Sequence, residues 1–165
     1  MVSEVNFPEQ TLLHGKEEDS FYRDAFLVNP TRSNLPAKYV YHSVFGHFPN
    51  FILSFYRIRN RIARLFNRSE VSYPTYFSYN DIYQGGKIDF VTFEKISAAE
   101  VVVVANEKNM DIWVSVLRVS DRRFIISTLI NFKSKKGRIY MRLIRPLHQM
   151  ATKYCIRQAI KARRL

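Results

Sequence analysis

Cysteine is almost absent from this sequence, because the chain of 165 residues contains only Cys155. One cysteine cannot form an internal disulfide, which excludes a disulfide-stabilised fold and favours a reducing compartment. No apolar run approaches the roughly 18 residues that a transmembrane helix needs. Residues 1–20 have no apolar core and carry five acidic residues, so they do not resemble a signal peptide. We therefore expect a soluble, cytoplasmic protein.

Glycine and proline are also scarce, with five and six residues, and no segment is of low complexity or repeats another. Hydrophobic residues make up 47% of the chain, which excludes general disorder, and the length is that of one domain. We expect residues 1–20 to form a flexible acidic N-terminal arm and residues 21–165 to form a single folded domain.

The sequence lacks recognisable catalytic and metal-binding motifs. It contains no nucleophile-elbow, phosphate-loop or dinucleotide-binding pattern. The histidines do not have the spacing of metal ligands; they are His14, His42, His47 and His148. Cys155 and His148 lie seven residues apart in one helical pattern, but a buried helix cysteine is far commoner than a Cys–His nucleophile. We therefore expect no metal, no cofactor and no intrinsic catalysis.

Acidic residues are missing from the C-terminal part of the chain. Residues 122–165 hold 13 Lys and Arg and no acid, whereas residues 1–121 hold the other 13 together with all 14 Asp and Glu. The net charge of +12 therefore belongs to the C-terminal part. We favour the simpler interpretation, a solvated helix face with a basic tail. The alternative is a surface that binds the phosphates of nucleic acid or of a membrane. Its candidate residues are Arg57, Arg61, Arg64, Lys133, Lys135, Lys136, Arg138 and Arg142.

Periodic segments follow one another clearly along the chain. Apolar and β-branched patterns predict strands at residues 21–28, 87–96, 99–106, 110–119 and 124–132. The turns between the later strands are short, which predicts an antiparallel meander. Residues 71–84 are rich in tyrosine without a clean period and are expected to form a connector.

Helical spacing predicts helices at residues 37–45 and 51–66, with Asn50 capping the second. A longer helix near the C-terminus includes Ile139, Leu143 and Tyr154, and Pro146 either kinks it or begins a new helix. The predicted fold class is α+β: an antiparallel meander sheet packed against a long C-terminal helix, with two helices after the first strand.

Several short motifs carry a family resemblance over residues 12–160. They are Tyr22-Arg23-Asp24-Ala25-Phe26, Pro49 with Arg59-Asn60-Arg61, Asp111 with Val114-Ser115-Val116, Ser127-Thr128, Gly137-Arg138-Ile139-Tyr140 and Ile144-Arg145-Pro146-Leu147-His148. On these residues the chain resembles the helix-grip fold of the START-like (SRPBCC) superfamily. More closely, it resembles a small bacterial family of unknown function near that superfamily, whose domains also occur attached to short-chain dehydrogenase-like domains. It departs from that family at Asn109, Trp113 and Phe51, where His, Arg and Trp are usual.

The resemblance implies a cavity between the sheet and the last helix that binds an apolar or amphipathic small molecule. The residues expected to bind this ligand are Arg59, Asp111, Trp113, Thr128, Tyr140 and His148. We favour an ion pair of Asp111 with Arg59 or Arg138, because a buried carboxylate needs a cation, and leave open its role as a polar anchor in the cavity. A cofactor-free enzyme that uses Asp111 and His148 is the remaining alternative.

Overall fold

A computed structural model of the chain describes residues 2–48, 50–66 and 76–165. Its elements are β1 (Ser3–Glu4), β2 (Phe21–Val28), α1 (Ala37–Phe45), α2 (Asn50–Leu65), a 3-10 turn η1 (Tyr79–Asp81), β3 (Lys87–Ile88), β4 (Val91–Ile96), β5 (Glu100–Asn106), β6 (Met110–Ser120), β7 (Arg123–Phe132) and α3 (Lys135–Lys161). Within the described ranges, no helix is long and apolar enough to cross a membrane.

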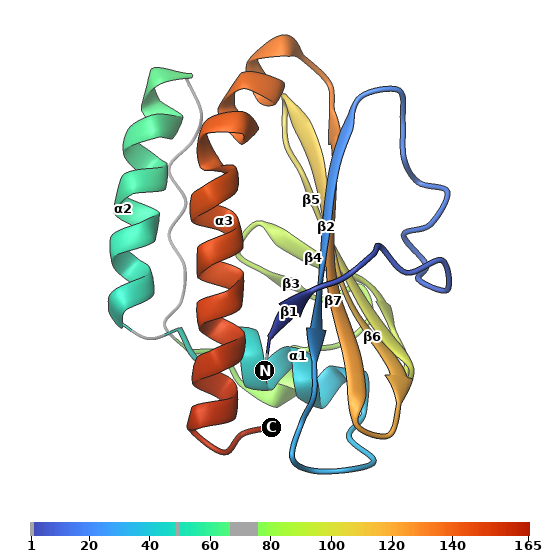
Figure 1. Cartoon of the computed structure of the whole chain (residues 1–165). Helices are drawn as coiled ribbons and strands as arrows, with labels where there is room; N and C mark the ends of the chain where they lie inside the picture. The colour runs from blue at the N-terminus through green and yellow to red at the C-terminus, as the bar shows by residue number, and fades with distance from the viewer. Residues whose placement is uncertain (1, 49, 67–75) are drawn as a thin grey trace.

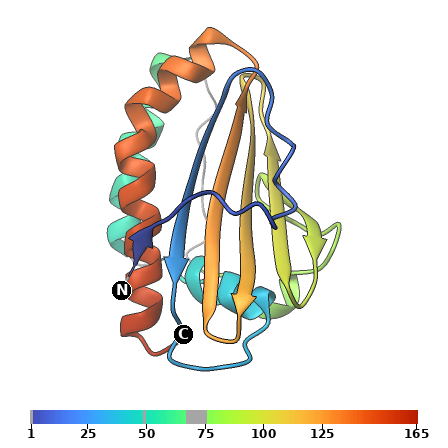
Figure 2. The same ribbon diagram turned by 45° about the vertical axis from the view of Figure 1, so that its right-hand side comes forward.

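The strands form one antiparallel sheet in the order β1-β2-β7-β6-β5-β4-β3. Consecutive strands β3 to β7 make the meander, and β2 returns to pair with β7. Helices α2 and α3 lie side by side on one side of this sheet, while the segment that leads into β2 crosses the other side (Figures 1 and 2). The predicted α+β class is therefore confirmed, and the arrangement is consistent with a helix-grip-like fold.

Two predicted boundaries differ from the structure. The strand expected at residues 87–96 is divided into β3 and β4, because Asp89 has a φ of 51° and its left-handed backbone turns the chain. Asn50 is the first residue of α2 rather than its cap. The connector predicted at residues 71–84 lies partly outside the described residues, as does Pro49 of the family pattern.

The inner face of the sheet carries the main core. Alternate residues of β2, β5, β6 and β7 pack there against α1 and α3, since side chains along a strand point to opposite faces. Members of this core from the strands are Phe26, Val28, Val101, Val103, Val116 and Ile126; members from the helices include Val40, Val44, Ile156 and Ala159. All ten are less than a twentieth exposed.

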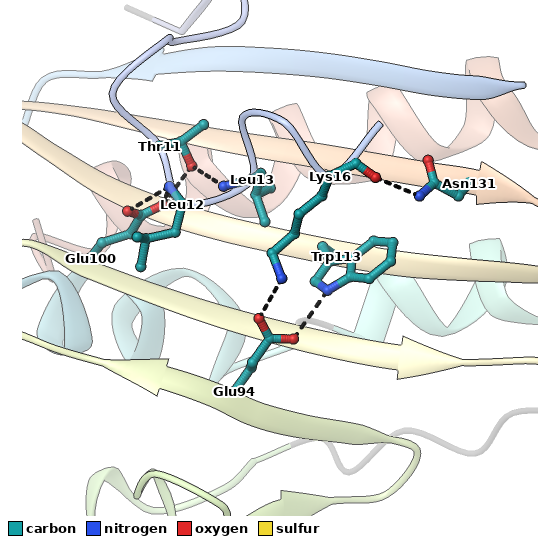
Figure 3. A network of polar contacts seen from close by, with 8 residues as sticks. All are labelled: Thr11, Leu12, Leu13, Lys16, Glu94, Glu100, Trp113 and Asn131. Carbon is teal, nitrogen blue, oxygen red and sulfur yellow. Dashed lines mark hydrogen bonds and ion pairs between the residues drawn. The ribbon is translucent and has the colours of Figure 1, made fainter. Parts of the chain in front are cut away.

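The outer face is covered by the N-terminal segment, which Figure 3 shows in detail. The Thr11 hydroxyl donates to Glu100 Oε1 at 2.5 Å, and the Leu12 amide donates to the same carboxylate at 3.1 Å. Leu13 is fully buried beside Val102 and Leu129. The interpretation of residues 1–20 as a separate flexible arm stays a prediction, but these contacts give the outer face its cover.

The start of α3 is tied to the turn between β5 and β6. The Ser134 hydroxyl accepts from the Gly137 amide at 3.1 Å and donates to Asn109 Oδ1 at 2.9 Å. The Asn109 carbonyl accepts from the Lys133 amide at 2.9 Å. A Cβ atom on Gly137 would lie 2.4 Å from that carbonyl oxygen, so only glycine fits here without a backbone shift.

Pro146 lies inside α3 rather than at the start of a second helix. Its ring removes the amide that would otherwise donate to the Arg142 carbonyl. Figure 2 shows that α3 is bent in its N-terminal half.

We predict that Gly137→Ala destabilises the protein by about 1–3 kcal/mol, because the new methyl group overlaps a backbone oxygen that cannot move freely. Urea denaturation measures the change. The matched control is Lys136→Ala, an exposed neighbour in the same helical turn, which should alter the free energy of unfolding by no more than about 0.5 kcal/mol. Equal stability of the two variants would contradict the close contact.

Candidate functional site

A cavity of about 270 Å³ lies between the inner face of the sheet and the helices. Its wall is mainly apolar and includes Ile52, Phe55, Val114, Ile126, Met141 and Ile144. Strands β5, β6 and β7 form one side, whereas α1, α2 and α3 form the other. Protein interiors contain few voids larger than one water molecule, so a space of this size is a distinctive feature of the fold.

Four of the six residues expected to bind a ligand line this cavity: Arg59, Thr128, Tyr140 and His148. Arg59 reaches it from α2, Thr128 from β7, and the other two from α3. The Arg59 guanidinium lies 5.9 Å from the centre of the Tyr140 ring and 3.9 Å from Glu107 Oε1. The structure thus brings these four side chains to one space, although their role in binding stays a prediction.

The other two, Asp111 and Trp113, do not line the cavity. Both lie on β6, where Met110, Ile112 and Val114 line the cavity, so the alternate residues point to the outer face. Asp111 Oδ1 lies 2.6 Å from Lys133 Nζ. The expected need for a cation is met, but by Lys133, which lies between β7 and α3, instead of Arg59 or Arg138.

Trp113 supports the N-terminal segment on the outer face. Its indole nitrogen donates to Glu94 Oε2 at 3.2 Å, and Lys16 Nζ lies 2.8 Å from the other oxygen of that carboxylate (Figure 3). Lys16 Nζ also lies 5.6 Å from the centre of the indole ring. Trp113 therefore acts as a packing surface for the N-terminal segment and not as a cavity wall.

The carboxylate beside His148 is Asp24, which the sequence analysis did not select. Asp24 lies on the inner face of β2, and its side chain is only 1% exposed. Its Oδ2 accepts from the Tyr22 hydroxyl at 2.6 Å and lies 3.4 Å from His148 Nε2. The alternative of a cofactor-free enzyme used Asp111 together with His148, but His148 lines the cavity whereas Asp111 does not.

Burial and attraction act in opposite directions on Asp24. Burial by itself would raise the pKa of this carboxyl group, but the neighbouring His148 and the hydroxyl of Tyr22 stabilise the carboxylate. Their combined effect holds the pKa of Asp24 below its usual value of 3.8. The group is therefore ionised at neutral pH although it is buried. The sequence held one signal of this site: Asp24 is the only acidic residue among the apolar and aromatic residues of its face of β2.

Cys155 also lines the cavity, but it does not form a nucleophile. Burial raises the pKa of its thiol to about 12, so the thiolate is almost absent at neutral pH. This is consistent with a buried core cysteine. Among the described residues, no group of three His, Cys, Asp or Glu side chains is arranged to hold a metal ion.

All eight candidate anion-binding residues are exposed. Three lie on α2, one at the end of the sheet and four on the first half of α3. Helix α2 carries four arginines and α3 carries eight Lys and Arg, and neither helix contains an acidic residue. The basic surface is therefore a property of these two neighbouring helices.

Comparison with known families identifies the chain. Residues 18–155 match the model of a family described as "Protein of unknown function (DUF2867)", and the chain belongs to this family. No curated protein and no solved structure matches the chain.

We predict that Asp24→Asn reduces the acid sensitivity of the fold. The pKa of Asp24 is lower in the folded than in the unfolded chain. Its contribution to stability is therefore fully present above the pKa of the unfolded chain, and it is lost as the pH falls through the pKa of the folded chain. The wild type should therefore lose more free energy of unfolding than the variant between about pH 5 and pH 2. Denaturation curves across this range measure it, with exposed Asp19→Asn as control. Parallel pH profiles for wild type and Asp24→Asn would contradict the prediction.

Proposed function

We propose that the protein binds an apolar or amphipathic small molecule in the cavity beneath α3. The proposal rests on two properties of the cavity together: its volume and the mainly apolar character of its wall. Water occupies about 30 Å³ per molecule in the liquid, so the cavity is several times larger than one water. The mainly apolar wall offers water molecules few hydrogen-bond partners. Replacing such water by an apolar ligand is therefore favourable.

Polar groups on the cavity wall support an amphipathic ligand. Arg59, Thr128 and His148 place polar groups on a wall that is mainly apolar. Sites of this kind use the apolar wall for affinity and a few polar side chains for orientation. On this proposal the protein is a cytoplasmic binding domain without intrinsic catalysis, and the START-like likeness extends from the fold to the use of the cavity.

The cavity proposal is tested with N-phenyl-1-naphthylamine, a fluorescent probe whose neutrality avoids attraction to the basic surface. We expect saturable binding at one site. Val114→Phe adds a ring to the cavity wall and should weaken binding about tenfold or more by filling space. Val119→Phe lies on the same strand at an exposed position and should leave binding unchanged.

Native mass spectrometry of the protein as purified gives an independent reading, because a retained adduct of small mass identifies the natural occupant. Unsaturable probe binding, or equal binding by the two phenylalanine variants, would refute the cavity proposal.

A second function is favoured by the solvent face of α2 and α3: attachment to an anionic membrane surface. Six large apolar side chains on these helices are about half or more exposed; they are Phe51, Ile58, Leu65, Ile139, Leu143 and Met150. We call them the outer apolar rows. The ring of Phe51 packs against Tyr154 of α3 at 5.1 Å, so the row on α2 borders α3.

The two properties of this face fit a lipid surface better than a nucleic acid. Apolar side chains among Lys and Arg let a helix insert into the interface while the cations contact anionic headgroups. A nucleic acid would use the cations but would gain little from exposed Leu, Ile and Met. Among the described residues, six of the eleven exposed large hydrophobic side chains lie in the outer apolar rows.

Sedimentation with vesicles tests the membrane proposal. We expect binding to vesicles of phosphatidylcholine with phosphatidylglycerol, and little to phosphatidylcholine alone. Leu65→Ser with Leu143→Ser should reduce binding about tenfold or more, whereas Val119→Ser on the sheet should not. The membrane proposal fails if the serine variant binds like the wild type, or if binding to both vesicles is absent while an RNA oligonucleotide is retained.

A further inference from the structure

Two histidines are in contact at the C-terminal end of α1. The ring centres of His42 and His47 lie 5.1 Å apart, and the centre of the Tyr76 ring lies 5.0 Å from that of His47. His47 Nδ1 is shielded from solvent and, among the residues that the structure describes, has no hydrogen-bond partner. Buried polar atoms are rarely left in this state, so this nitrogen requires a physical explanation.

The surroundings of His47 oppose its protonation. Burial has the largest effect and lowers the pKa of His47 below its usual value of 6.5. Repulsion by Arg164, which follows α3, and by His42 lowers this pKa further, whereas the His42 backbone acts weakly in the opposite direction. The neutral ring is therefore the form that suits the folded chain.

The charged groups on the far side of His42 do not change this balance. The ring centre of Tyr79 lies 5.8 Å from that of His42, and Lys38 Nζ lies 4.2 Å from the same tyrosine ring. Asp81, the acid of the η1 turn, accepts from a backbone amide of its own turn at 2.8 Å. None of these contacts gives His47 Nδ1 an acceptor.

The two histidines join the end of α1 to the segment before η1. His47 forms an isolated β-bridge with Tyr76, and the Phe77 amide donates to the Gly46 carbonyl at 3.3 Å. His42 Nε2 donates to the Phe77 carbonyl at 2.9 Å. We call His42, His47, Tyr76 and Phe77 the histidine latch.

The histidine latch adjoins the aromatic part of the cavity wall. Phe77 lines the cavity, as do Phe45 and Phe48, which are close to His47 in the sequence. Tyr41 also lines it, and its ring centre lies 5.1 Å from that of Phe45 and 6.4 Å from that of Phe77. The position of these rings therefore depends on the contacts of the latch.

We propose that the histidine latch makes the cavity release its ligand under mildly acidic conditions. A proton on His47 Nδ1 would be a buried charged donor without an acceptor, close to the positive charge of Arg164. The latch contacts would loosen, and the aromatic rings would no longer be held against a ligand. Binding of a ligand and protonation of His47 would thus oppose each other. This inference rests on the proposed binding function of the cavity.

The direction of the pH effect follows from the lowered pKa of His47. Because this pKa is lower in the folded than in the unfolded chain, the contribution of neutral His47 to stability is fully present above the pKa of the unfolded chain. This contribution is lost as the pH falls through the pKa of the folded chain. The latch is therefore closed at neutral pH and opens on the acidic side of 6.5.

The inference is tested with N-phenyl-1-naphthylamine, which stays neutral between about pH 7.5 and pH 5.5, the range in which histidine titrates. We expect the dissociation constant of the wild type to rise about threefold or more over this range. His47→Phe keeps an aromatic ring that cannot be protonated, and its dissociation constant should change less than about 1.5-fold. The exposed control His14→Gln should follow the wild type.

A histidine NMR titration of the wild type reads the latch without a ligand and without a variant. The ring resonance of His47, assigned by through-bond experiments, should titrate below pH 6.5. A titration of His47 at or above this value would refute the latch, whether or not His47→Phe folds.

The outcomes separate this inference from the proposed function. If the probe does not bind at neutral pH, the binding function is refuted, and the latch that rests on it is refuted too. If the probe binds equally across the range, the binding function stands and the latch is refuted. If His47→Phe loses affinity in acid like the wild type, another group in the cavity wall causes the change, and the latch is again refuted.

Discussion

The four valines at positions 101–104 require that both faces of β5 be covered, and the rest of the structure provides these two covers. Successive residues of a strand face opposite sides of the sheet, so a run of apolar residues must be covered on both faces. Val101 and Val103 pack into the core beneath the helices, whereas Val102 packs against Leu13 of the N-terminal segment. Glu100, directly before this run, provides the polar attachment for Thr11 and Leu12. One strand thus determines where both covering layers must lie.

The two coverings differ in how closely they fit. On the outer face, hydrogen bonds from Thr11 and Leu12 and a few apolar side chains hold the N-terminal segment directly on the strands. On the inner face, α2 places only Ile52, Phe55 and Ala63 in buried positions. The space left beneath the helices is the cavity. Both the proposed ligand site and its polar wall are consequences of this looser packing.

Local periodicity predicted the helices and most of the strands, though not β1 or the break between β3 and β4, because each element depends on residues only a few positions apart. It also showed that Asp111 needs a cation, but the choice of Lys133 depends on how the corner before α3 folds. Asp24 and His148 are 124 positions apart in the sequence and meet only because β2 returns to pair with β7. The attachment of Thr11 to Glu100 spans 89 positions and was missed for the same reason. Contacts of this kind depend on tertiary structure, which a pattern in one segment does not encode.

Helix α3 takes part in both proposed sites, because Tyr140, Ile144 and His148 line the cavity while Ile139, Leu143 and Met150 lie on its solvent face. Pro146 lies between them, in the part of the helix with one backbone hydrogen bond fewer. If occupation of the cavity changes the bend of α3, it changes the affinity of the outer face. Thermodynamic reciprocity then requires attachment at the outer face to change the affinity of the cavity by the same factor. Ligand binding in the cavity and membrane attachment at the outer face would then be two equilibria that are coupled through α3.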